Sequence, residues 1–577
     1  MIKYSVFTKH PHRHFISFSA EFEVKNRKEV LLQLPSWRPG RYELGNFAKN
    51  IRAWKVVDEN GVVLSFRKTS KDAWIVQTNG VARFFLTYEY YAAELNAGSS
   101  FLDEDQLYIN PVNCFFYDAD FPGDSYEIKL HLPDNYIVAC GLASPSKHVL
   151  TAQSFDELAD CPLIASATIR QLRYEVGAIP FNIWIQGAVN LNEQRLIQDF
   201  EAFTKIQLEM FGDIPCKEYH FLYQFVPYFL RHGVEHSNST VITMGPAADF
   251  QQEHLYKDLL GISCHELFHT WNVKNIRPVE MMPYDFTREN YSEQGYVYEG
   301  VTTYYGDSLL WRSGAFEQED WLEVIDGHIQ DYVSNYGRLN LSVAQSSWDT
   351  WLDGYVAGIP WRKVSIYNEG FLVALMCDLL LLQHSKGTCS LDVVMKRMYE
   401  RFGKEAVGYS AEDYWSLLND CGVYNFDSIY QSFILGTQDY ISQLREVLVF
   451  AGVQINFGQS GKWGEAKLGV SIDESNLKCI VSGVVPHSPA DDAGLWYGDE
   501  IISVNGHAPY KNVQQLLRMF GAGAELTVMR KGNRSLVNIA ADGACWLAKY
   551  RCSRVEAPTE QQEFIWKRWN AGLVKHP

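Results

Sequence analysis

Residues 264–271 read Cys-His-Glu-Leu-Phe-His-Thr-Trp and contain the pattern His-Glu-x-x-His. Four residues span about one turn of a helix, so His265 and His269 would share a helical face and could hold one metal ion. Glu266 would project beside them, within reach of a water molecule at that metal. Residues 255–262 are mostly good helix formers, which supplies the helical context. The pattern also occurs in helices that bind no metal, so the rest of the chain has to decide its meaning.

A third ligand is expected from a later helix, because a catalytic zinc ion takes three protein ligands and keeps one position open. Glu299 begins a predicted helix, 299–312, and its neighbours are apolar or aromatic. Burying a carboxylate there is costly unless a metal compensates it. A carboxylate favoured by the helix macrodipole is the alternative. We predict that His265, His269 and Glu299 hold one Zn²⁺ per chain, with Glu266 as general base.

A competing metal motif occurs at residues 232–236, His-Gly-Val-Glu-His, which fits the inverted pattern His-x-x-Glu-His. That pattern needs a helix to bring its histidines together. Gly233 and the runs at 237–240 and 241–243 favour an extended or turn conformation, so we reject this metal site. Glu235 can still contribute to the cleft by binding a free α-amino group, as in an exopeptidase. A solvated glutamate at a strand end is the alternative.

Composition narrows the class of protein. The 577 residues suffice for about three to four domains, and 14% of them are aromatic, which provides large side chains for a core. The net charge of −18 argues against nonspecific binding of nucleic acid, because such binding needs a basic face. The 11 cysteines include no CxxC pair, and an odd, irregular set predicts reduced thiols.

No targeting or membrane segment is recognised in the sequence. The N-terminal stretch lacks an apolar signal-peptide core. The longest apolar run, 371–382, is interrupted by Asp378 and is too short to span a bilayer. We therefore expect a cytoplasmic protein without a membrane span.

The pattern of apolar residues divides the chain. Alternation at 18–24 and the hairpin signal Asn60-Gly61 predict antiparallel strands and a sandwich-like β domain. In that domain the segment Leu34-Pro-Ser-Trp-Arg-Pro-Gly-Arg-Tyr42 predicts only a turn with aromatic packing. The fold class is α+β multidomain, and the expected parts are a β domain at 1–170, a catalytic domain with a helical lobe at 171–451, a Gly- and Gln-rich linker at 452–464, a domain of short strands at 465–545 and a helical tail at 546–577.

Several stretches together resemble one family. They are His265–Pro278, Glu299–Tyr305 (Glu-Gly-Val-Thr-Thr-Tyr-Tyr), Gly233-Val-Glu-His236, Tyr367-Asn-Glu-Gly370 and Leu34–Gly40. This combination resembles the PDZ-containing glycyl-aminopeptidase family of bacterial zinc metallopeptidases, which are gluzincins related to aminopeptidase N. The resemblance covers nearly the whole chain and implies a thermolysin-like peptidase domain.

The resemblance also implies roles for residues. His265, His269 and Glu299 would be the zinc ligands and Glu266 the general base. Gly233, Glu235 and His236 would be substrate-binding residues, and Glu235 would bind the substrate amine. Tyr367 would donate a hydrogen bond to the oxyanion, a contribution of about 2.7–4 kcal/mol; a packed aromatic side chain at a helix start is the alternative. Glu369 stands where the relatives usually have lysine, which leaves the electrostatic surroundings of Tyr367 open.

The C-terminal part resembles a bacterial PDZ domain in Leu468-Gly-Val470 and in residues 485–506. PDZ domains add a peptide as an extra strand and hold its carboxylate with backbone N–H groups. Leu468, Gly469 and Val470 would form that loop. A PDZ fold that serves only as a lid or packing element is the alternative.

Together these observations predict a zinc aminopeptidase that acts on short peptides, and the resemblance implies a preference for a small N-terminal residue, glycine or alanine. Two other functions stay open. One is a zinc endopeptidase that recruits substrate C-termini through its PDZ domain. The other is an inactive peptide-binding scaffold, against which the intact motif and Glu299 argue.

Overall fold

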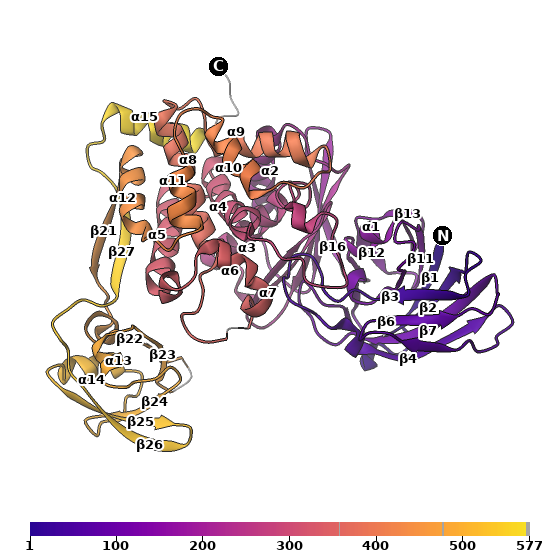
Figure 1. The fold of residues 1–577 in the computed structure, drawn as a ribbon, viewed down its shortest axis with the longest axis horizontal. Coiled ribbons are helices and arrows are strands. Elements are labelled where there is room, and N and C mark those ends of the chain that lie inside the picture. The colour runs from indigo at the N-terminus through magenta and orange to yellow at the C-terminus, as the bar shows by residue number, and fades with distance from the viewer. Residues whose placement is uncertain (357, 476–477, 573–577) are drawn as a thin grey trace.

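The computed structural model describes residues 1–356, 358–475 and 478–572 (Figure 1). An N-terminal β part, a central part that contains most of the helices and a small C-terminal β part follow one another along the chain. In Figure 1 the N-terminal part lies at the right and the C-terminal β part at the lower left, below the helices. This arrangement confirms the predicted α+β multidomain class.

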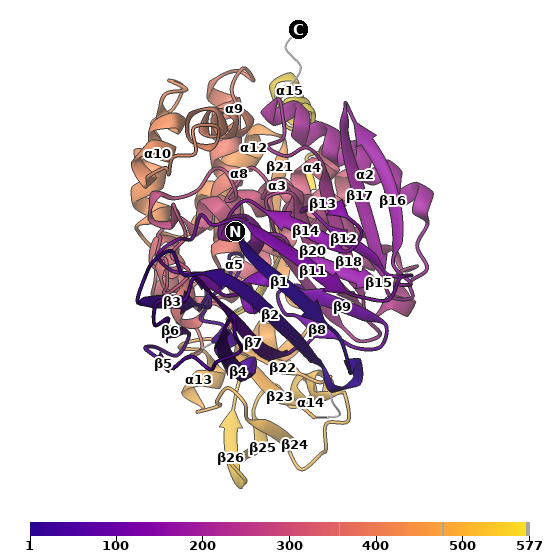
Figure 2. The ribbon, with the colours of Figure 1, turned by 90° about the vertical axis from the view of Figure 1, so that its right-hand side faces the viewer.

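The N-terminal part is built on a seven-stranded sheet that packs against smaller sheets (Figure 2). In β2 (Phe15–Glu23) every second side chain is buried, as the alternation predicts. The Asn60-Gly61 hairpin is also confirmed, since the Asp58 N–H bonds to the Val62 carbonyl. One pairing is parallel, that of β1 (Ile2–Phe7) with β11 (Tyr126–His131). The remaining strands of this sheet are β4 (Ile51–Asp58), β7 (Arg83–Tyr91), β13 (Ala143–Ser146) and β14 (Val149–Ala152).

The central part begins with a five-stranded sheet in which each of the two edge strands is antiparallel to its neighbour. The sheet is covered by α2 (Glu193–Phe211), where Phe200 packs against Phe221. At one edge of the sheet, α3 (Glu253–Phe268) lies beside the strands Ser239–Gly245 and Leu230–Glu235. The strands in sheet order are β16 (Arg170–Val176), β17 (Ile179–Gln186), β18 (Tyr219–Phe225), β20 (Ser239–Gly245) and β19 (Leu230–Glu235).

The helical lobe surrounds α8 (Ile366–His384), which is buried along nearly its whole length. By length and composition α8 could cross a membrane, but 89% of its most apolar window is buried inside the protein, as in a core helix. Its neighbours include η6 (Tyr296–Val301), a π-helix, with α4 (Thr302–Ser313), α5 (Gln318–Ser334), α9 (Leu391–Met398) and α12 (Tyr440–Phe450). In turn, α10 (Ala411–Asn419) packs beside α9.

The segment predicted as a linker, 452–464, differs from the expectation. It contains β21 (Val453–Gln459), which pairs antiparallel with β27 (Ala548–Arg554) over its full length. Its partner lies far away in the sequence, so the local Gly- and Gln-rich composition could not reveal the pairing. β27 is tied to α5, because Gln330 donates to the Ala548 carbonyl and accepts from the Tyr550 N–H.

The C-terminal β part is a five-stranded sheet followed by the predicted capped helix. That helix, α15 (Glu560–Ala571), has the expected capping box and packs beside α4 and α8. Trp361 of the central part contacts the sheet by donating to the Val484 carbonyl at 3.1 Å. The strands in order are β22 (Val470–Asp473), β23 (Ile480–Val484), β24 (Glu500–Val504), β25 (Ala524–Arg530) and β26 (Asn533–Ile539).

Candidate active site

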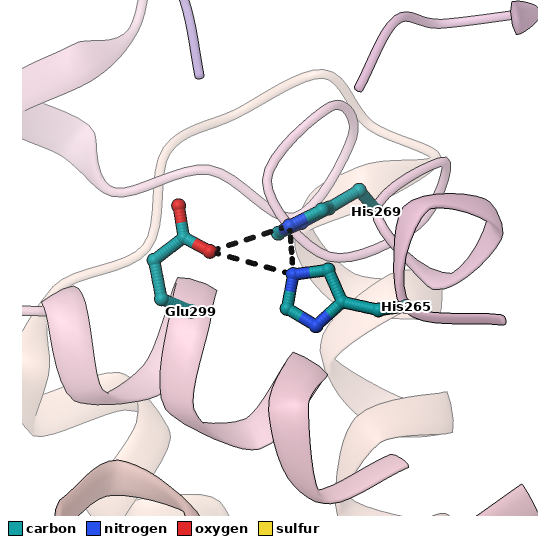
Figure 3. Close-up of side chains that lie close together, drawn as sticks. All are labelled: His265, His269 and Glu299. Carbon is teal, nitrogen blue, oxygen red and sulfur yellow. Dashed lines mark hydrogen bonds and ion pairs between the residues drawn. The ribbon is translucent and has the colours of Figure 1, made fainter. Parts of the chain in front are cut away.

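The two motif histidines lie one helical turn apart at the end of α3, as predicted (Figure 3). Their Nε2 atoms face each other at 3.0 Å. Nδ1 of His269 lies 2.8 Å from the Asn272 carbonyl, so the ring proton belongs on Nδ1 and the Nε2 lone pair points into the site. Leu259 and Leu267 anchor α3, because both side chains are fully buried.

Glu299 reaches the same point from η6. Its Oε2 atom lies 3.3 Å from Nε2 of His269 and 3.8 Å from Nε2 of His265 (Figure 3). A tetrahedral zinc ion with bonds of about 2.0–2.2 Å sets its donor atoms roughly 3.3–3.6 Å apart. The donor set of two imidazoles and one carboxylate therefore fits zinc in both chemistry and spacing.

Burial and mutual charge decide the protonation of these ligands. Burial lowers the pKa of His265 to about 4, so its imidazole stays neutral. Burial alone would lower the pKa of His269 and raise that of Glu299. Their proximity reverses both effects, so the pKa of His269 is raised and that of Glu299 is lowered. The carboxylate is thus held in the charged form that ligates a metal.

Glu266 is buried beside the ligands, and its Oε2 atom has no hydrogen-bond partner among the described residues. Burial raises its pKa to about 8, and the charges of Glu235 and Glu299 add to this effect against that of His269. A Cβ atom at Gly233 would lie 2.1 Å from Oε1 of Glu266, so only glycine lets this carboxylate rest against β19.

Glu235 faces the same cleft from the end of β19, a strand that confirms the predicted extended conformation. It is buried, and within the described residues its Oε1 atom has no partner. Glu235, Glu266 and His269 each offer one atom within 4.8 Å of the others. The cleft has a volume of about 550 Å³.

His236 does not reach the cleft, contrary to the role that the resemblance implied. Its Nδ1 atom lies 3.2 Å from Oδ1 of Asp160, to which Lys274 also donates at 2.7 Å. Successive side chains of an extended chain point to opposite sides, so His236 turns away from the side that Glu235 faces. His236 instead joins the N-terminal part to the central part.

Tyr367 lines the cleft at the start of α8, near Glu299. Gly300 and Gly370 allow this proximity, because a Cβ atom at Gly300 would lie 2.3 Å from the Gly370 Cα. Burial, together with the charge of Glu299, raises the pKa of Tyr367 well above its usual value. The hydroxyl therefore keeps its proton and can donate it in a hydrogen bond.

Glu369 lies away from the Tyr367 hydroxyl. It lines a separate small cavity with Tyr332, Arg338 and Tyr440. Neither of its oxygens has a hydrogen-bond partner among the described residues, and burial raises its pKa to about 8. The glutamate that stands in place of the usual lysine thus does not bring a negative charge against Tyr367.

The segment 34–42, for which only aromatic packing is predicted, reaches the site. Tyr42 donates a hydrogen bond of 3.0 Å to Oε1 of Glu299. A Cβ atom at Gly40 would lie 2.4 Å from Oε2 of Glu235. Arg38 is buried and donates to Nε2 of His232 at 3.4 Å. The unusual composition of this segment was the only signal of a role, because its contacts are all distant in sequence.

The loop predicted to bind a peptide carboxylate leads into the edge strand β22, which lies in the C-terminal β part and away from α3 (Figure 1). Leu468 and Val470 are buried in the core of the C-terminal sheet. Gly469 has φ +68°, and a Cβ atom there would lie 2.4 Å from the Cβ of Ser488. Among the described strands β22 pairs only with β23, so its other edge can accept an added strand.

Comparison with protein-family models gives matches to three separate stretches of the chain. Residues 3–167 match the model of the peptidase M61 N-terminal domain, residues 258–373 that of the M61 glycyl aminopeptidase and residues 480–530 that of a PDZ domain. A search of curated protein sequences found no match.

Solved structures are also similar. The crystal structure of an aminopeptidase N family protein from Idiomarina loihiensis has 25% identity and a TM-score of 0.90, and the match covers 98% of this chain and 100% of that one. An M1 zinc metallopeptidase from Deinococcus radiodurans has 13% identity and a TM-score of 0.46, over 76% of this chain and 94% of that one. The chain therefore contains an M61 peptidase N-terminal domain, an M61 glycyl aminopeptidase domain and a PDZ domain: it is a metallopeptidase of the aminopeptidase type.

Proposed function

We propose that this protein is a zinc-dependent aminopeptidase that removes small N-terminal residues, glycine or alanine, from peptides. One observation carries the proposal. Glu235 is buried in the cleft, its Oε1 atom has no hydrogen-bond partner among the described residues, and one of its carboxylate oxygens lies within 4.8 Å of donor atoms of Glu266 and His269. A buried carboxylate oxygen without a hydrogen-bond partner is costly, and the ammonium group of a peptide would compensate this cost by donating to it.

The metal would be held by His265, His269 and Glu299, whose donor atoms lie within 4.8 Å of one another. When bound, zinc supplies Lewis acidity, which lowers the pKa of water and polarises a peptide carbonyl. The remaining chemistry belongs to the side chains around it.

Three side chains divide the reaction. Glu266 removes a proton from the attacking water and later delivers it to the leaving nitrogen, for which its raised pKa is suited. Tyr367 donates a hydrogen bond to the oxygen of the former carbonyl. Glu235 holds the ammonium group and so fixes which peptide bond lies between the other two.

Limited space beside Glu235 supports the preference for small residues. The backbone of Gly40 lies so close that a single added carbon would meet Oε2 of Glu235 at 2.4 Å. Tyr42 fills the neighbouring position, since its hydroxyl bonds to Glu299. A large first side chain would have to displace one of these groups.

The charged residues that line the cleft away from Glu235 support a preference for basic residues after the cleaved bond. Besides Glu235, the cleft is lined by Arg231, which lies toward the other end of β19, and by four carboxylates, Asp258, Asp307, Glu323 and Asp331. If Glu235 holds the first residue, the peptide continues toward α5 and these groups. Lysine or arginine after the cleaved bond would be favoured over glutamate.

The test compares Gly-Ala-Lys-Phe-NH₂ with its N-acetylated form, using wild-type protein and Glu235→Gln. We expect the free peptide to lose glycine and the acetylated one to resist cleavage. We expect Glu235→Gln to lower kcat/KM for the free peptide, and this decrease should correspond to a loss of about 2–5 kcal/mol in transition-state binding. Equal cleavage of both peptides, or internal cleavage of the acetylated one, would instead support the endopeptidase. No hydrolysis by zinc-loaded protein would support the scaffold.

A further inference from the structure

Two cysteines meet in the helical lobe, outside the site described above. Cys389 lies in the turn between α8 and α9, and Cys421 follows α10. Their sulfur atoms are 2.9 Å apart, and both residues are free thiols. We propose that Cys389 and Cys421 form a redox-modification site, in which a peroxide converts the pair into a reversible disulfide.

The positions of Cys389 and Cys421 leave both thiols accessible to a small oxidant and allow the two sulfur atoms to form a bond. Both side chains are half-buried, whereas Cys114, Cys264 and Cys377 are completely buried. Each cysteine of the pair follows the end of a helix rather than lying inside one. Turns adjust by small backbone rotations, so the sulfur atoms can approach to the bond length of about 2.05 Å without distorting a helix.

The pair also divides the roles of nucleophile and resolving thiol. The Cys389 S–H donates to Cys421, which lowers the pKa of the Cys421 thiol despite its partial burial, and Arg397 adds to the effect. The same hydrogen bond and burial raise the pKa of Cys389. Cys421 is therefore the readier thiolate, and Cys389 keeps its proton until the second step.

The reaction balances with hydrogen peroxide as the oxidant. The Cys421 thiolate attacks one peroxide oxygen, the O–O bond breaks, and sulfenic acid and hydroxide form. Cys389 then attacks the Cys421 sulfur, the S–S bond forms, and the sulfenic oxygen leaves as water. The two thiols lose two electrons, the peroxide becomes two water molecules, and a dithiol reductant reverses the change.

The bond would tie the α8–α9 turn to α10. Trp415 of α10 donates to the Tyr296 hydroxyl at 2.8 Å, and Tyr296 belongs to the same π-helix as Glu299. The covalent link would restrict the unfolded lobe and so stabilise it. We expect the oxidised protein to unfold a few degrees above the reduced protein, with its metal site unaltered.

Peptide mapping tests the proposal directly. Trypsin places Cys389 in the peptide 387–396 and Cys421 in 405–445, and neither peptide contains a second cysteine. The full-length zinc-loaded protein is treated with hydrogen peroxide, alkylated and digested without reduction. We expect these two peptides linked with the loss of two hydrogen atoms, and their separation after dithiothreitol.

Variants provide the controls. In Cys421→Ser and Cys389→Ser the link and the rise in Tm should both disappear, while hydrolysis of a glycyl peptide shows that the protein is folded. Cys545→Ser is the matched control, because Cys545 is exposed and its replacement should leave the link unchanged. If Cys389 and Cys421 still react with the alkylating reagent after peroxide has oxidised Cys545, or if either links to another cysteine, the proposal is wrong.

Discussion

The hydroxyl of Tyr42 donates a 3.0 Å hydrogen bond to Oε1 of Glu299, so the N-terminal part supplies the partner of the carboxylate that we propose as a metal ligand. The other oxygen, Oε2, faces the two histidines. Fixing one oxygen orients the other, and this is how groups around a metal site tune its ligands. The N-terminal part thus belongs to the site rather than merely flanking it.

Replacing Tyr42 by phenylalanine should therefore weaken the metal site without unfolding the protein. Loss of such an outer partner typically costs 10–100-fold in metal affinity or activity, and we expect about that loss. Zinc release to a competing chelator and kcat/KM on a glycyl peptide measure it. Tyr228→Phe, at an exposed turn, is the control. Zinc affinity equal to that of wild type would show that the hydrogen bond does not orient Glu299.

Gly40 and Gly61 form a matched pair for testing the closed end of the cleft. Both have positive φ, +79° and +82°, so alanine costs each about 1–2 kcal/mol of backbone strain. Only Gly40 lies against Glu235; a Cβ atom at Gly61 would have no neighbour within 4 Å among the described residues. Gly40→Ala should lower kcat/KM for free-amine peptides at least tenfold more than Gly61→Ala. Equal activity of the two variants would contradict the role of Gly40.

Glu369 should make stability depend on pH. Its pKa is raised by burial from 4.5 to about 8, so between these values the folded protein keeps a proton that the unfolded chain releases. Stability therefore falls as pH rises from 4.5 to 8, and below 4.5 the difference vanishes. Glu369→Gln should be more stable by about 3 kcal/mol at pH 7 and nearly unchanged at pH 4.5.

Thermal unfolding at both pH values measures this effect, with Glu446→Gln on the exposed face of α12 as the control. A variant that is no more stable than wild type at pH 7 would show that Glu369 is charged in the folded protein.

The acidic residues that line the cleft away from Glu235 should select the residue after the cleaved bond. We expect Gly-Lys peptides to exceed Gly-Glu peptides in kcat/KM by at least fivefold at low salt, and the ratio to fall as salt screens the charges. Glu323→Gln should narrow the ratio, because Glu323 lines the cleft from α5. A ratio that depends neither on salt nor on Glu323 would point to shape rather than charge.

Much of the metal centre could be predicted because its signals are local. A helical turn places His265 and His269 together, and the apolar surroundings of Glu299 mark a buried carboxylate. The glycine and polar residues around Glu235 likewise predict the extended chain that became β19. In each case neighbouring residues determine the conformation.

The remaining features depend on contacts that local sequence cannot show. Tyr42 meets Glu299 across the boundary between two parts of the chain. His236 is turned away by its partner Asp160, which lies in the N-terminal part. The ribbon of β21 and β27 joins segments on either side of the PDZ domain. Each requires knowledge of how distant segments pack.

That ribbon has a consequence for any peptide that the PDZ domain holds. A flexible linker would let the domain sample a large volume, and capture would only raise the local concentration of substrate. Here the paired strands β21 and β27 are hydrogen-bonded through Gln330 to α5, and other residues of α5 line the cleft. The chain thus enters and leaves the domain through a ribbon that is bonded to α5. We expect this attachment to favour peptides long enough to reach from the domain to the cleft.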